Sequence, residues 1–163
     1  MSTETQGTQP LSVTATTTVD VPIDEAFLFF TEEIGNWWNA DHHIIEAPLS
    51  HMVFDPFVGG NVYDVGTDGS ECRWSRVLVY DRPHRVVFSW DINGHWAIET
   101  DPDKCSEVEV TFTADGPATT RVVLEHQHLE RHGDDLLPQI DGMRNGWQAG
   151  VDLYAAAVSG RAS

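Results

Sequence analysis

Alternating hydrophobic and polar positions predict that most of this chain folds as short antiparallel β-strands. Turn motifs such as Asp68-Gly69 and Asn93-Gly94 separate the alternating runs. The expected strands cover residues 11–19, 50–55, 61–66, 71–80, 84–92, 107–114 and 119–128. Within 84–92 the apolar face, which should meet the core, carries Val86, Phe88, Trp90 and Ile92. We expect Arg85, Ser89 and Asp91 on the opposite face.

Helical signals follow the first strand and close the chain. Pro22, Asp24 and Glu25 predict a short helix running to Phe30, because proline and acidic residues suit a first helical turn. A second short helix should carry Trp37 and Trp38. The strongest signal covers residues 139–158, where apolar side chains recur every three or four positions at Ile140, Met143, Trp147, Val151, Tyr154 and Val158.

A stripe of glycines runs along this last predicted helix. Gly142, Gly146 and Gly150 each lower helix propensity by about 1 kcal/mol, so their presence needs a reason. The flanking residues are too polar for a membrane helix pair. Two explanations remain open: the sheet comes very close to the helix, or space is left for another molecule.

Composition limits the chain to one folded unit and argues against polyanionic partners. With 163 residues and 40% hydrophobic content, we expect one domain over residues 11–160 after a disordered tail at 1–10. A formal charge of −17 would repel nucleic acid and anionic membrane surfaces. No stretch approaches the roughly 18 apolar residues that span a bilayer. Cys72 and Cys105 form no disulfide or zinc framework, which favours a reducing cytoplasm.

Several short motifs resemble the family named for the activator of heat-shock-protein-90 ATPase homologue, in the START-like (SRPBCC) superfamily of polyketide cyclases and lipid-transfer proteins. The resemblance covers about residues 12–158, although Ser75 replaces the family's usual glycine. The motifs are Val21-Pro22, Trp37-Trp38, Phe54-Asp55-Pro56, Gly59-Gly60, the block from Trp74 to Trp90, Thr120–His126 and Gly146-Trp147.

The resemblance implies an α+β helix-grip fold: a curved seven-stranded antiparallel sheet around a long C-terminal helix, with two short helices after the first strand. It also implies a cavity between the sheet and that helix. We expect aromatic and aliphatic side chains to line it, because rigid rings give large apolar contact areas. The candidate lining residues are Trp38, Trp74, Phe88, Trp90, Trp96, Phe112, Leu124, His126, His128, Met143 and Trp147.

His126 and His128 are the sharpest chemical feature, because residues two apart on a strand project to the same side. They could orient the polar end of a ligand, bind a metal, or simply form hydrogen bonds at the cavity rim. A metal would need a third ligand that the spacing of His42, His43, His51 or Glu46 does not supply, so we expect no metal and no cofactor. Arg76 could anchor a ligand carboxylate or pair with a surface acid.

Three functions are compatible with this pattern. The leading hypothesis is binding of a hydrophobic or aromatic small molecule, lipid-like or polyketide-like, without catalysis. The second is an enzyme of cyclase, dehydratase or hydrolase type that uses a pocket histidine. The third is stimulation of a chaperone ATPase, which ranks last because the family's eukaryotic activators carry an additional N-terminal domain. Homodimerisation stays open.

Overall fold

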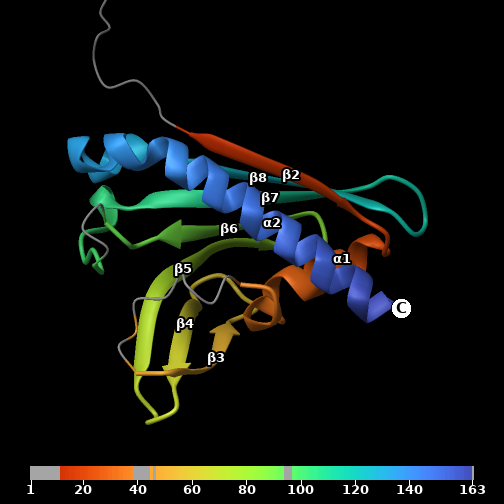
Figure 1. Cartoon of the computed structure of the whole chain (residues 1–163), viewed down its shortest axis with the longest axis horizontal. Coiled ribbons are helices and arrows are strands. Elements are labelled where there is room, and N and C mark those ends of the chain that lie inside the picture. The colour runs from red at the N-terminus through yellow and green to blue at the C-terminus, as the bar shows by residue number, and fades with distance from the viewer. Residues whose placement is uncertain (1–11, 39–44, 46, 94–96, 163) are drawn as a thin grey trace, which may run out of the picture.

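A seven-stranded antiparallel sheet curls around the C-terminal helix in the computed structural model, which describes residues 12–38, 45, 47–93 and 97–162 (Figure 1). The predicted disordered tail at 1–10 lies outside the described residues. The strands are β2 (Val13–Val19), β3 (Leu49–Phe54), β4 (Asn61–Gly66), β5 (Glu71–Asp81), β6 (Arg85–Trp90), β7 (Ser106–Ala114) and β8 (Thr120–Gln127). Their order in the sheet is β2-β8-β7-β6-β5-β4-β3.

Two β-bulges lie on β5, where the sheet bends. Trp74 is the extra residue opposite Val62 and Tyr63 of β4, and Leu78 is the extra residue between Val77 and Val79, opposite β6. An extra residue in one strand bends it and increases its twist. The 11-residue β5 consequently curves away from the β2–β8–β7 end of the sheet (Figure 1).

Helix α1 (Ile23–Thr31) follows β2, a 3₁₀ turn over Ile34–Asn36 comes next, and α2 (Ile140–Ala162) closes the fold. The phenol of Tyr154 on α2 donates a hydrogen bond of 2.7 Å to the Ala26 carbonyl on α1. Phe30 packs its ring against Tyr154 at 5.2 Å, and Phe27 packs against Phe112 of β7 at 5.1 Å. Aromatic packing and burial therefore hold both helices on the concave face, which confirms the predicted helix-grip architecture.

The apolar face of β6 is buried as its alternation predicted. The opposite face differs from an ordinary wet face, because Ser89 and Asp91 are also buried. Arg73 and Arg76 of β5 both reach the Asp91 carboxylate at 3.1 Å. The Glu99 N–H donates to the Asp91 carbonyl at 2.7 Å, which places the segment around Glu99 beside it. Around Asp91, side chains on both faces of the sheet are therefore buried.

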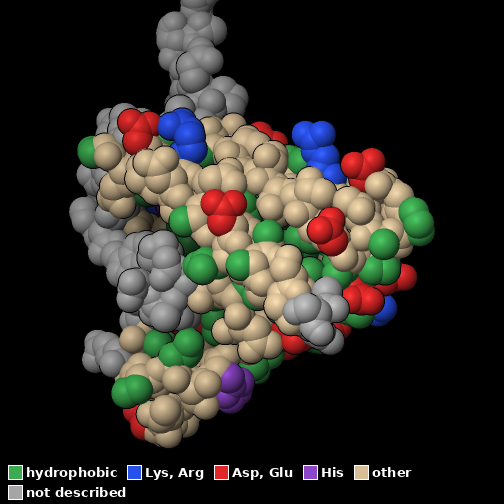
Figure 2. Space-filling view, turned by 45° about the vertical axis from the view of Figure 1, so that its right-hand side comes forward, with side chains coloured by type: hydrophobic (Ala, Val, Ile, Leu, Met, Phe, Trp, Pro, Cys, Tyr) green, Lys and Arg blue, Asp and Glu red, His purple; other side chains and the backbone are tan. Residues whose placement is uncertain are grey.

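The acidic side chains visible in Figure 2 are distributed over that face of the molecule among hydrophobic and polar ones. This distribution agrees with the spread of the net charge of −17 along the chain. Among the described helices, none is long and apolar enough to cross a membrane.

Candidate functional site

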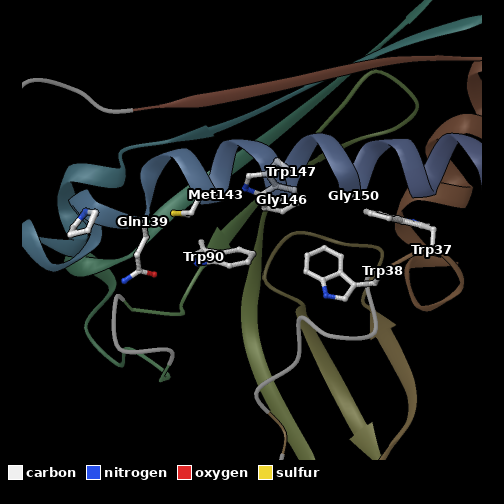
Figure 3. A pocket seen from close by; sticks show the side chains of 10 residues that line it. Trp37, Trp38, Trp90, Gln139, Met143, Gly146, Trp147 and Gly150 are labelled. Atoms are coloured by element: carbon white, nitrogen blue, oxygen red, sulfur yellow. The ribbon is translucent and has the colours of Figure 1, made fainter.

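A cavity of about 380 Å³ lies beside the N-terminal half of α2 (Figure 3). Across the cavity from this helix lie the end of β6 and the segment that follows α1. Its walls come from segments far apart in sequence, so only the folded chain assembles them. The described residues that line it are Trp37, Trp38, Trp90, Pro138, Gln139, Gly142, Met143, Gly146, Trp147 and Gly150. Figure 3 shows Met143, Gly146 and Trp147 of α2 above the rings of Trp38 and Trp90.

Tryptophan rings form most of the apolar wall and support one another. The ring centroid of Trp147 lies 5.7 Å from that of Trp38 and 5.4 Å from that of Trp90, both in edge-to-face arrangements. Trp74 backs the wall, 5.1 Å from Trp38, while its indole N–H donates to buried Asp64 at 3.3 Å. Such mutual packing fixes the ring orientations before any ligand arrives, which limits the entropic cost of binding.

The glycine stripe of α2 faces this cavity. A Cβ atom added at Gly142 would meet no heavy atom within 4 Å, and one added at Gly150 would lie 4.0 Å from a ring carbon of Trp147. A close approach of the sheet therefore does not explain either glycine. The second explanation fits both positions, because open space lies beside them.

His126 and His128 do not project to the same side, so that expectation is wrong. Strand β8 ends at Gln127, and His128 adopts a left-handed conformation with φ of 62°. Its half-exposed side chain lies 3.7 Å from Glu130, away from the core that encloses His126. The strand alternation cannot extend past the residue where the strand ends.

His126 is fully buried, and protein groups occupy both of its ring nitrogens. The Trp147 indole N–H donates to Nδ1 at 2.9 Å, and Nε2 lies 2.7 Å from the Ser106 hydroxyl. The same hydroxyl lies 2.6 Å from Nε2 of His132. Burial, and secondarily the neighbouring His132, hold the pKa of His126 well below its usual value. The ring is therefore neutral at physiological pH and does not line the cavity.

The remaining sequence-predicted lining residues fall into three groups. Trp38, Trp90, Met143 and Trp147 line the cavity. Phe88, Phe112 and Leu124 instead fill the hydrophobic core, where Phe112 packs against Phe27 and Phe88 against Phe54. Trp96 lies outside the described residues.

The side chain of Arg76 pairs with buried Asp91, and this bond is the main reason that the pKa of Arg76 is raised. Arg76 therefore pairs with an acidic residue of the protein, as one of the two expectations for it held, but that residue is buried and not on the surface.

Residues that the sequence interpretation missed complete the site. Ser106 begins β7 two positions before inward-facing Val108, so the alternation was a usable signal for it. Trp37 lines the cavity from a turn, and Pro138 and Gln139 line it from a 3₁₀ helix (Asp134–Gln139). His132 lies in another 3₁₀ helix (Leu129–His132), and in such short elements no hydrophobic period indicates the direction of a side chain.

The chemistry of this wall favours apolar recognition. The described lining residues carry no carboxylate, imidazole, thiol or amine, and the Gln139 amide is their most polar side chain. Within the described ranges, no group of three His, Cys, Asp or Glu side chains is placed to hold a metal ion.

Comparisons with known proteins agree with this geometry. Residues 20–158 match the family described as activator of Hsp90 ATPase homolog 1-like protein. A search of curated proteins found no match. Among solved structures, the anthrahydroquino-gamma-pyrone synthase Txn09, complexed with SUM, is 33% identical with a TM-score of 0.62. That match covers 90% of this chain and 96% of Txn09.

Two further solved structures, each under 20% identical, show the fold alone. Protein MLL2253 from Mesorhizobium loti is 17% identical over 91% of this chain and 97% of its own, with a TM-score of 0.65. DynU16, from the dynemicin biosynthetic locus, is 17% identical with a TM-score of 0.63, over 91% of this chain and 47% of its own. By its sequence match and its helix-grip architecture, this chain belongs to the activator of Hsp90 ATPase homolog 1-like family.

Proposed function

We propose that this protein binds a planar, fused-ring aromatic molecule of the polyketide type in the cavity beneath α2. One observation carries the proposal: tryptophan rings wall a space of about 380 Å³, and α2 contributes three glycines to its lining beside Met143 and Trp147. Small-molecule sites commonly have volumes of roughly 300–1,000 Å³ and are mostly apolar with a few polar groups.

The shape and polarity of the wall favour flat rings over flexible lipid chains. Indole rings held at centroid distances of 5.4 and 5.7 Å offer flat faces and edges to a ligand. A planar ligand also loses less conformational entropy on binding than an alkyl chain does. The Gln139 amide is the most polar side chain of the described lining. The net charge of −17 disfavours ligands with several phosphates.

The relative Txn09 supports the same ligand class. Its name describes a synthase of an anthrahydroquino-gamma-pyrone, which is a fused aromatic ring system, and 96% of its chain is covered by this one. The family relationship thus supports a ligand-binding fold, and the tryptophan wall is the reason to propose an aromatic ligand.

Isothermal titration calorimetry with 1,8-dihydroxyanthraquinone tests the proposal. At about −0.3 kcal/mol per non-hydrogen atom, this probe should bind with a dissociation constant of about 100 µM or tighter. Trp90→Leu should weaken binding at least tenfold, about 1.4 kcal/mol. Leu153→Ala, at an exposed position on α2, is the matched control and should bind as the parent does. Preference for palmitate over the anthraquinone would refute the aromatic class.

The kinship with a synthase favours a second candidate function, ring closure of such a ligand. Since His126 is internally bonded and the described wall lacks an acid or base, catalysis would come from holding the substrate folded. A suitable probe is 1-(2-hydroxyphenyl)butane-1,3-dione. In this compound the phenol oxygen adds to the distal ketone, and loss of water gives 2-methylchromone. Chromatography should show faster chromone formation with the parent than with Trp90→Leu; equal rates would exclude this candidate.

A further inference from the structure

The indole N–H of Trp147 is not available to a ligand, although the ring lines the cavity. It donates to His126 Nδ1 at 2.9 Å, and His126 is fully buried outside the lining. Trp37 shows the same arrangement, since its indole N–H donates to the Phe30 carbonyl at 3.2 Å. An indole N–H can only donate, so each bond fixes which edge of the ring faces the protein. At these two residues the wall offers ring carbon to the cavity.

The hydrogen bonds beyond Trp147 form a chain with one direction. Because Nδ1 of His126 accepts, the neutral ring must carry its proton on Nε2, which donates to the Ser106 hydroxyl at 2.7 Å. Ser106 then donates its own proton to His132 Nε2 at 2.6 Å, and its backbone N–H reaches the same nitrogen at 3.3 Å. One tautomer of each histidine fits these bonds, and it places the His132 proton on Nδ1, a buried atom with no hydrogen-bond partner among the described residues.

The imidazole of His126 in this hydrogen-bond chain also packs against the ring of Trp90. The His126 ring lies 5.2 Å from the Trp90 ring and 5.8 Å from the Trp147 ring. One imidazole thereby contacts two walls of the cavity from behind. A side chain used only to fill the core at this position would need neither the hydroxyl of Ser106 nor the directional bond to Trp147.

We propose that His126 is a positioning residue, which acts through Trp147 to hold the indole with its N–H turned to the protein and its carbon edge and face toward the ligand. This inference rests on the proposed function and sharpens its specificity. At this wall the site selects a hydrocarbon ring face over a hydrogen-bond acceptor. Ser106 and His132 complete the chain that holds the imidazole in the required tautomer.

Two substitutions at His126 separate positioning from simple packing. His126→Leu fills a similar volume but cannot accept from the indole. His126→Gln keeps one acceptor and one donor. We expect His126→Leu to weaken binding of 1,8-dihydroxyanthraquinone about tenfold, as the loss of a buried hydrogen bond allows, and His126→Gln to stay within about threefold of the parent. Val110→Ala, a core truncation on β7, is the control for general destabilisation and should leave affinity unchanged.

Indole N–H signals in ¹H–¹⁵N spectra supply a readout that packing alone would not move. Trp147→Phe identifies the Trp147 signal among those of the six tryptophans. This signal should shift upfield in His126→Leu and return toward the parent in His126→Gln. An unchanged signal in folded His126→Leu would overturn the inference. If the parent fails to bind the probe, the proposed function fails, whereas the ligand-free spectra still decide the positioning role.

Discussion

Replacing two glycines of α2 by alanine should stabilise the protein and impair its ligand site at the same time. Gly142 and Gly150 have ordinary helical conformations, and an added Cβ would meet no heavy atom closer than 4.0 Å at either position. Alanine therefore introduces no clash in the ligand-free protein. It does place a methyl group in the cavity that both residues line.

The magnitude follows from helix propensity. A glycine-to-alanine change in a helix interior, as at Gly150, gains about 1 kcal/mol, and Gly142 in the first turn of α2 should gain less, so the double variant should gain about 1–2 kcal/mol. The two sites lie eight residues apart on α2, and neither added Cβ meets a heavy atom closer than 4.0 Å, so near-additivity is expected. For a chain of this length the gain corresponds to a melting temperature about 2–8 °C higher. Differential scanning calorimetry and urea denaturation measure both quantities.

The ligand measurement decides what the glycines are for. Calorimetric titration with 1,8-dihydroxyanthraquinone should show affinity about tenfold lower, or 1.4 kcal/mol, in the double variant. Gly160→Ala is the matched control, because its added Cβ also meets no heavy atom within 4 Å but it does not line the cavity. It should stabilise, by less near the helix end, without changing affinity. A destabilised double variant, or one that binds as the parent does, would refute this reading of the stripe.

Three further predictions concern groups outside the cavity lining. Burial lowers the pKa of His126, so the native state binds fewer protons than the unfolded state and stability should fall as pH drops below about 6.5, by up to about 1.4 kcal/mol per pH unit. Urea denaturation at several pH values should show a shallower dependence in His126→Gln. Asp91→Asn should lower the free energy of unfolding by about 2–3 kcal/mol, because the buried carboxylate loses charge-assisted bonds from Arg73 and Arg76. Burial raises the pKa of the Cys105 thiol to about 12, so a disulfide reagent at pH 8 should modify half-buried Cys72 first.

Each of these predictions has a contradicting result. Identical pH dependence in the parent and His126→Gln would show that the imidazole titrates normally. An Asp91→Asn variant as stable as the parent would mean that desolvation cancels the ion pair, which occurs for buried pairs. Mass spectrometry that finds Cys105 modified before Cys72 in the folded protein would contradict its burial.

Strong local periods made the strands and the long helix predictable. On β7 every second residue from Val108 to Phe112 is buried, and α2 buries Trp147, Val151, Tyr154 and Val158 at helical spacing. The glycine stripe also pointed to the cavity, but only the structure decides between close packing and open space. That decision depends on which element lies opposite the stripe, and helix periodicity does not contain this information.

Sequence-based predictions failed at the end of a strand and where a side chain contacts a residue that is distant in the sequence. The alternation predicts an inward His128 only if it continues one residue beyond β8, and no residue type marks the end of that strand. Asp91 is buried because Arg73 and Arg76 reach it from a bulged neighbouring strand. His132 joins Ser106 only because a 3₁₀ turn follows the left-handed residue. The placements of Asp91 and His132 depend on tertiary contacts between segments 15 or more residues apart.

A flat aromatic ligand in the proposed site would lie between the tryptophan wall and the glycine stripe. Intermolecular nuclear Overhauser effects between bound 1,8-dihydroxyanthraquinone and the protein test this placement. We expect contacts from ligand ring protons to the indole C–H groups of Trp90 and Trp147 and to the Cα protons of Gly142 and Gly146. Contacts instead to Leu28, Phe29 and Val158, which line a second hollow between α1 and α2, would contradict it.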